Sequence, residues 1–280
     1  MKLGFNLLLW TPHVTLAHEP VLRALKKTGY DGVEIPMFEG DPDHYARLGE
    51  LLDRIGLERT VVSVIQGKNP LSPDAASRAA ALDYAKWTID CSAALGAPIL
   101  GGPMHSELGF FSGAPATAAE RKRALSFHKK AGDYAGRKGI TFALEALNRF
   151  ECYFLNTMEQ LNAYLDEVDH PHVQGMYDTF HANIEEKNPV SAIRTIRPHM
   201  VHVHISENDR GTPGKGHVPW AETYRALKKA KYDGWLTIEA FGRSMPALAA
   251  ATRVWRDFAP SPEEVYKLGF RNMKQGWAKA

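Results

Sequence analysis

Eight short, apolar, β-rich runs recur along this chain, separated by longer segments with apolar residues at helical spacing. Strict alternation of strands and helices predicts parallel strands joined by helical crossovers. Eight such units predict a closed (β/α)₈ TIM barrel of the α/β class rather than an open sheet. The runs are Leu3–Trp10, Gly32–Met37, Thr60–Ile65, Pro98–Met104, Ile140–Leu147, Val173–Asp178, Met200–Ser206 and Trp235–Phe241.

The main alternative fold is an open, doubly wound sheet that binds a dinucleotide. Such a sheet carries a Gly-x-Gly-x-x-Gly turn after its first strand, whereas TPHVT follows the first run here. A length of 280 residues suits one large core and is short for two ordinary domains. We therefore predict that residues 1–280 form a single barrel domain, with an additional C-terminal helical segment after Phe258.

Composition limits the classes of partner that the protein is expected to bind and the cellular compartment in which it is expected to act. The 34 basic and 32 acidic side chains leave a net charge of +2, which provides no strong field for nucleic acid or an anionic membrane. Cys91 and Cys152 are too few for a disulfide framework or a cysteine-rich zinc site. The sequence starts in a strand-like run without a signal-peptide pattern, and no apolar stretch reaches about 18 residues. We expect a soluble, cytoplasmic protein that acts on a small molecule.

Four side chains of metal-ligand type lie at or near the ends of the last four runs: Glu145, Asp178, His204 and Glu239. Their separations of 33, 26 and 35 residues each equal about one strand–helix unit, so adjacent strands can deliver them to one point at the barrel mouth. Three carboxylates and one imidazole, without a thiolate, favour Mn²⁺, Mg²⁺ or Co²⁺. The pattern predicts one divalent-metal site.

The competing interpretation is that these are buried polar residues with ordinary protein partners. Glu145 and Glu239 stand in apolar surroundings (FALEAL and LTIEAF), where an unpaired carboxylate is costly, so the metal interpretation is favoured for both. Asp178 could instead cap the following helical turn. His202 points to the same face as His204, so one of the two could be a ligand and the other a packed core histidine.

Three polar residues follow the predicted ligands on loops that leave the barrel mouth: Glu151, His181 and Arg210. Loops at this end of a TIM barrel hold substrate. The guanidinium of Arg210 suits sugar oxygens or a carboxylate, and Glu151 and His181 can bind hydroxyl groups. Loop capping or a surface ion pair would explain the same spacing about equally well.

Three further residues are weaker candidates for substrate contact. His105 lies where a substrate wall is expected after the fourth run, although a hydrogen-bonded loop histidine explains it better. Trp10 and Phe241 could pack on a sugar face, although aromatic residues at strand ends more often belong to the core or the rim.

The segments LEALNRFE, YDTFHANIEE, HVHISENDRG and LTIEAF closely resemble those of the D-tagatose 3-epimerase and D-allulose (psicose) 3-epimerase family, within the xylose isomerase-like barrels. The resemblance covers nearly the whole chain. It implies one divalent ion, usually Mn²⁺, with Co²⁺ or Mg²⁺ as alternatives, on the four predicted ligands. It also implies an acid/base pair of Glu145 and Glu239, substrate contacts from Glu151, His181 and Arg210, and a homo-oligomer, either a dimer or a tetramer.

The resemblance leads to the hypothesis of metal-dependent epimerisation of a ketose at C3. One glutamate would remove the C3 proton to give an enediolate that the metal stabilises, and the other would return a proton on the opposite face. Aldose–ketose or hydroxypyruvate-type isomerisation is the nearest alternative, because it needs only that the proton be returned to a different carbon. An endonuclease IV-like nuclease would need additional histidines, and a non-catalytic sugar-binding barrel would not need both glutamates.

Two loops depart from the family pattern. The family usually has a tryptophan after the fourth strand and another aromatic residue after the first, where this chain has HSELGFFSG and TPHVT. These loops are therefore expected to influence which sugar is accepted.

Overall fold

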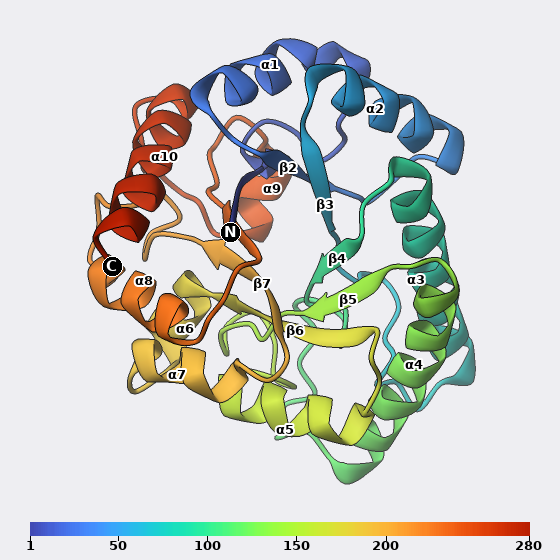
Figure 1. Ribbon diagram of the computed structural model, residues 1–280. Coiled ribbons are helices and arrows are strands. Elements are labelled where there is room, and N and C mark those ends of the chain that lie inside the picture. Colours follow the sequence, from blue (N-terminus) through green and yellow to red (C-terminus); the bar gives the residue numbers. More distant parts are fainter.

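Eight parallel strands form a closed barrel in sequence order, as predicted, with β1 hydrogen-bonded to β8. The computed structural model describes residues 1–280, except for the side chain of Ala247. A ring of helices surrounds the barrel (Figure 1). The strands are β1 (Lys2–Asn6), β2 (Gly32–Pro36), β3 (Glu58–Val62), β4 (Ile99–Gly102), β5 (Thr141–Leu144), β6 (Val173–Asp178), β7 (Met200–Ile205) and β8 (Trp235–Ile238).

The helical segments predicted between the strands are also present. Three of the helices, α1, α2 and α3, end at glycines with positive φ, namely Gly29, Gly56 and Gly96, as their sequences indicate. The helices are η1 (Leu7–Leu9), η2 (Leu16–His18), α1 (Glu19–Thr28), α2 (Pro42–Ile55), α3 (Ala75–Leu95), α4 (Ala118–Arg137), α5 (Met158–Val168), α6 (Thr179–Glu185), α7 (Pro189–Ile196), α8 (Trp220–Lys229), α9 (Pro246–Ala251) and α10 (Pro262–Lys279); η1 and η2 are 3₁₀ helices.

The expected C-terminal helix α10 completes the outer ring. It contacts α8 and α1 on either side and β1 and β8 beneath, so it fills the place between the last and the first helix of the ring (Figure 1). The short helix α9 instead lies inside the ring in this view. Its Ala249 packs with Leu8, Val62 and Phe241 in a small apolar cluster separate from the main core. The segment after β8 therefore covers part of the barrel mouth.

Except for β6, the predicted strands were too long at their C-terminal ends. The first run was predicted to extend to Trp10, but β1 ends at Asn6, whose side chain accepts a hydrogen bond from the Leu8 amide and begins η1. After β5 and β8 the chain leaves the ladder although residues such as Leu147 and Phe241 remain buried. Apolar residues at the mouth therefore extend the hydrophobic pattern beyond the strand itself.

His128 on α4 provides a pH-dependent contribution to stability. It is fully buried against the Tyr164 hydroxyl, and burial, with a smaller effect of His105, lowers its pKa to about 3. Below the ordinary histidine pKa, the unfolded chain therefore binds a proton that the folded chain does not. Stability should fall as the pH falls from 6.5 toward 3, and this residue should account for about 1.5 kcal/mol of loss between pH 6.5 and pH 5.

Urea unfolding of the wild type and of His128→Gln at these two pH values tests this expectation. The variant should be less stable at pH 6.5 because it loses the contact with Tyr164, but its further loss at pH 5 should be smaller than that of the wild type by about 1.5 kcal/mol. Equal losses in the two proteins would show that His128 does not carry this dependence.

Candidate metal and active site

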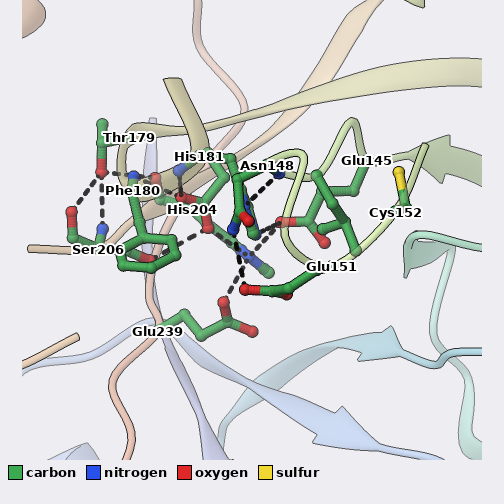
Figure 2. Close-up of polar contacts among 12 residues, drawn as sticks. Glu145, Asn148, Glu151, Cys152, Thr179, Phe180, His181, His204, Ser206 and Glu239 are labelled. Atoms are coloured by element: carbon green, nitrogen blue, oxygen red, sulfur yellow. Dashed lines mark hydrogen bonds and ion pairs between the residues drawn. The ribbon is translucent and has the colours of Figure 1, made fainter. Parts of the chain in front are cut away.

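The structure brings the four predicted ligand residues together at the C-terminal ends of neighbouring strands. Asp178 is the last residue of β6 and His204 lies in β7, whereas Glu145 and Glu239 directly follow β5 and β8. One candidate ligand atom from each residue lies within 4.8 Å of the others, and all four residues are buried. Figure 2 shows Glu145, His204 and Glu239 converging from separate elements.

The four residues fit a divalent cation in geometry and in charge. The Nδ1 atom of His204 and the Oε1 atom of Glu145 are buried without a hydrogen-bond partner among the described residues. His204 Nδ1 lies 3.5 Å from oxygen atoms of both Asp178 and Glu239. The Arg210 guanidinium contacts the carboxylates of Asp178 and Glu239, so the three carboxylates, once ionised, carry two negative charges more than this guanidinium balances. An oxygen-rich set with one imidazole suits Mn²⁺, Co²⁺ or Mg²⁺.

Asp178 is placed for both roles that its sequence left open, capping the next helix and binding a metal ion. Its Oδ1 atom accepts hydrogen bonds from the amides of Phe180 and His181, so it caps α6. Its Oδ2 atom accepts from the Ser206 hydroxyl at 3.2 Å and from Arg210 Nη1 at 3.1 Å on the side of the cluster. One oxygen therefore holds the backbone while the other faces the candidate ion.

Burial and neighbouring charges set the protonation states of the cluster. Burial raises the pKa of Glu145 to about 8, although His204 opposes this shift. Burial also disfavours the charged form of Asp178, but the Arg210 guanidinium together with His204 and His181 outweighs it, and the pKa of that carboxyl lies below its usual range. Because a bound cation favours the ionised form of every carboxylate ligand, metal binding should release protons.

The three predicted substrate residues line one cavity of about 930 Å³ together with Glu145 and Glu239. Arg210 Nη1 donates to Glu239 Oε2 at 2.7 Å, and Nη2 lies 2.9 Å from His181 Nε2. Glu151 accepts a hydrogen bond from the side-chain amide of Asn148, and the main-chain amide of Asn148 donates to His181 Nδ1 (Figure 2). The predicted loop residues thus form a connected polar wall beside the cluster.

Arg210 is held in its position by the backbone and by two aromatic rings. Its φ of 65° is in the left-handed region, which is unfavourable for a residue other than glycine. Its guanidinium lies 3.9 Å from the centre of the Phe180 ring and 4.9 Å from that of Phe241. These contacts direct a buried positive charge into the cavity rather than to solvent.

The three weaker candidates separate into one cavity residue and two supporting residues. Phe241 lines the cavity. Trp10 is not among the described lining residues and packs on Phe5 and Tyr266. His105 is also outside the described lining, and its Nε2 atom lies 2.9 Å from the carbonyl oxygen of Glu145, so it holds the backbone of a candidate ligand.

Sequence reasoning missed two residues beneath the cluster. Glu34 on β2 and Asn6 on β1 are fully buried, and both contact the predicted ligands. Glu34 could have been found from the sequence, because it is an acid inside the apolar strand GVEIP, as Glu239 is in LTIEAF. Of the two histidines in β7, His204 turns Nδ1 toward the acidic cluster, whereas His202 lies next to Glu34.

Comparison with known proteins agrees with this architecture. A family model described as a xylose isomerase-like TIM barrel matches residues 22–275. The chain is 32% identical to a probable ketose 3-epimerase of Synechocystis sp., over 98% of this chain and 96% of that protein. The chain belongs to the ketose 3-epimerase family.

Other members of the ketose 3-epimerase family are similar over nearly their full length. A D-psicose 3-epimerase of Agrobacterium fabrum is 31% identical, with 92% of this chain and 91% of that protein covered. The crystal structure of a D-allulose 3-epimerase from Methylomonas sp. in complex with D-allulose superposes with a TM-score of 0.92 at 29% identity, covering 98% of this chain and 96% of that one.

The two loops that depart from the family pattern both reach the cavity. Pro12 from TPHVT lines it, as do Leu108 and Gly109 from HSELGFFSG. Within the described residues, no helix combines the length and the hydropathy needed to cross a membrane.

Proposed function

We propose that the protein epimerises a ketose at C3 in a reaction that depends on one divalent metal ion, with Mn²⁺ as the preferred ion and Co²⁺ or Mg²⁺ as alternatives. The observation that carries this proposal is the convergence of Glu145 and Glu239 with Asp178 and His204 in one buried cluster at the cavity. Relatives named for D-psicose and L-ribulose support a free ketohexose or ketopentose as substrate.

Glu145, Asp178, His204 and Glu239 would hold the ion. When bound, it would supply positive charge that stabilises the negative charge developing on the substrate oxygens. Arg210 and His181 would bind hydroxyl or carbonyl oxygens near the reacting carbon, since both present nitrogen atoms inside the cavity. Burial and the positive charge of Arg210 lower the pKa of His181, which favours its neutral form.

Glu145 and Glu239 would perform the proton transfers. Inversion of a carbon requires one group to remove the proton and another to return a proton from the opposite face. The two glutamates come from β5 and β8, on opposite sides of His204 and Asp178 in strand order, and both line the cavity. Apolar side chains such as Phe180 and Leu147 line the same cavity and would limit the access of water to the reacting carbon.

Incubation of the Mn²⁺-loaded protein with a panel of ketoses in D₂O, followed by NMR, tests the proposed reaction. Epimerisation predicts an inverted ketose that carries deuterium at C3. A new aldose with deuterium at C1 or C2 would instead assign aldose–ketose isomerisation to the same site. If metal-loaded protein leaves the whole panel unchanged, the epimerase proposal is wrong for free ketoses.

A further inference from the structure

A layer of polar side chains from β1, β2 and β3 lies beneath the candidate metal ligands. Its members are Asn6, Glu34 and Thr60, and each is at most 1% exposed. These strands contribute none of the four candidate ligands, which come from β5 to β8. A group of buried polar residues on the opposite half of the barrel requires an explanation, because burying them without a role is costly.

Glu34 is the centre of this layer. Its Oε2 atom lies 2.7 Å from His204 Nε2 and accepts a hydrogen bond from Asn6 Nδ2 at 2.9 Å. Its Oε1 atom accepts from the Thr60 hydroxyl at 3.0 Å and lies 2.9 Å from His202 Nε2. The Asn6 amide, the Thr60 hydroxyl and the His204 ring can therefore donate to this carboxylate, which has only acceptors in its ionised form. The surroundings of Glu34 therefore suit a fixed anion.

The contact with Glu34 determines which nitrogen of His204 is available. A neutral imidazole carries one N–H, and the carboxylate of Glu34 draws it to Nε2. The lone pair is then on Nδ1, which faces Asp178 and Glu239 at 3.5 Å each. An imidazole that donates to a carboxylate is also a stronger ligand on its other nitrogen.

Asn6 connects the same layer to Glu239. The amide of Leu8 donates to Asn6 Oδ1 at 2.9 Å, which fixes the orientation of the side-chain amide. Asn6 Nδ2 therefore points to the carboxylates and donates to Glu34 Oε2 at 2.9 Å and to Glu239 Oε1 at 3.0 Å. Glu34 thus supports one candidate ligand directly and a second through Asn6.

We propose that Glu34 is a positioning residue that selects the metal-binding tautomer of His204 and thereby sets the affinity of the site for its divalent ion. This inference rests on the metal site of the proposed function. Loss of such a carboxylate partner typically weakens metal binding by about 10- to 100-fold. Glu34→Gln is therefore expected to weaken Mn²⁺ binding by about 10- to 100-fold, since glutamine keeps the size but loses the charge.

The affinity is measured by titrating metal-free protein with Mn²⁺ and recording the free ion by EPR, without any sugar. Glu207→Gln is the matched control, because Glu207 is a fully buried glutamate whose carboxylate binds the amides of Gly214 and Val218 instead. The control should lower the unfolding temperature and leave the Mn²⁺ affinity within about 3-fold of the wild type. A general loss of packing would affect both variants alike.

A spectroscopic measurement separates a positioning role from a merely structural one. In Mg²⁺-loaded, ¹⁵N-histidine-labelled wild type, His204 should show a protonated Nε2 and a ligated Nδ1, and Glu34→Gln should lose this fixed pattern. Glu34→Asp keeps the charge at a shorter reach and should bind Mn²⁺ with intermediate affinity. It also provides the test if the glutamine variant does not fold.

The outcomes distinguish this inference from the proposed function. If the wild type itself does not bind Mn²⁺, the metal-dependent function is wrong. If the wild type binds Mn²⁺ and both Glu34 variants bind it as tightly, with an unchanged His204 spectrum, only the role of Glu34 is overturned.

Discussion

Replacement of Glu239 by glutamine should reduce the rate of ketose epimerisation by about 10²- to 10⁴-fold, the range expected for loss of a general acid or base. A carboxamide has nearly the same shape but cannot accept and return a proton at this position. The fold should survive, because glutamine has nearly the same size and its one side-chain oxygen can still accept from either Asn6 or Arg210. Initial rates by NMR and the unfolding temperature provide the measurements.

Two controls separate proton transfer from other effects of this substitution. The rates are compared at saturating Mn²⁺, so that weaker metal binding does not lower the measured activity. Glu186→Gln changes a half-buried glutamate that binds the amide of Met158 outside the described cavity lining, and it should leave the rate unchanged. A Glu239→Gln protein that retains wild-type activity would remove the two-base mechanism.

Removal of the metal should have the second largest effect. Dialysis against EDTA should abolish epimerisation, and addition of Mn²⁺ should restore it. The chelated protein should also unfold at a lower temperature, because the clustered carboxylates lose their counter-charge. At a free Mn²⁺ concentration 100 times its Kd, binding contributes about 2.7 kcal/mol, or about 5–10 °C for a chain of this size.

A ligand variant serves as the control for metal removal. His204→Asn should show little change in unfolding temperature on addition of Mn²⁺, whereas His128→Gln should show the same increase as the wild type. Full activity and an unchanged unfolding temperature after exhaustive chelation would contradict a metal-dependent reaction.

The fold could be predicted because each strand–helix unit repeats the same local pattern. The predicted strand Val173–Asp178 matches β6 residue for residue, since a polar segment follows it at once. β8 was predicted three residues too long, because Ala240 and Phe241 remain apolar and buried at the mouth. Apolar residues in the sequence indicate which positions are buried, whereas a β-strand also requires hydrogen bonds to a neighbouring strand.

The candidate ligands could be located because adjacent parallel strands place their C-terminal ends at one edge. Glu34 carries the same signal, an acid in an apolar strand, but its partner His204 is 170 residues away across the barrel. The spacing of residues along the sequence does not predict a contact between side chains that meet inside a closed barrel. Trp10 was an uncertain candidate for a similar reason, because the early end of β1 directs its ring to Phe5 and Tyr266.

Exchange of the C3 proton in D₂O by the two glutamate variants tests the central claim most directly. If Glu145 and Glu239 act on opposite faces, Glu145→Gln and Glu239→Gln should each exchange the C3 proton of only one epimer. The two variants should act on different epimers, and neither should invert the carbon. Exchange of the same epimer by both variants, or continued inversion by either, would contradict the account.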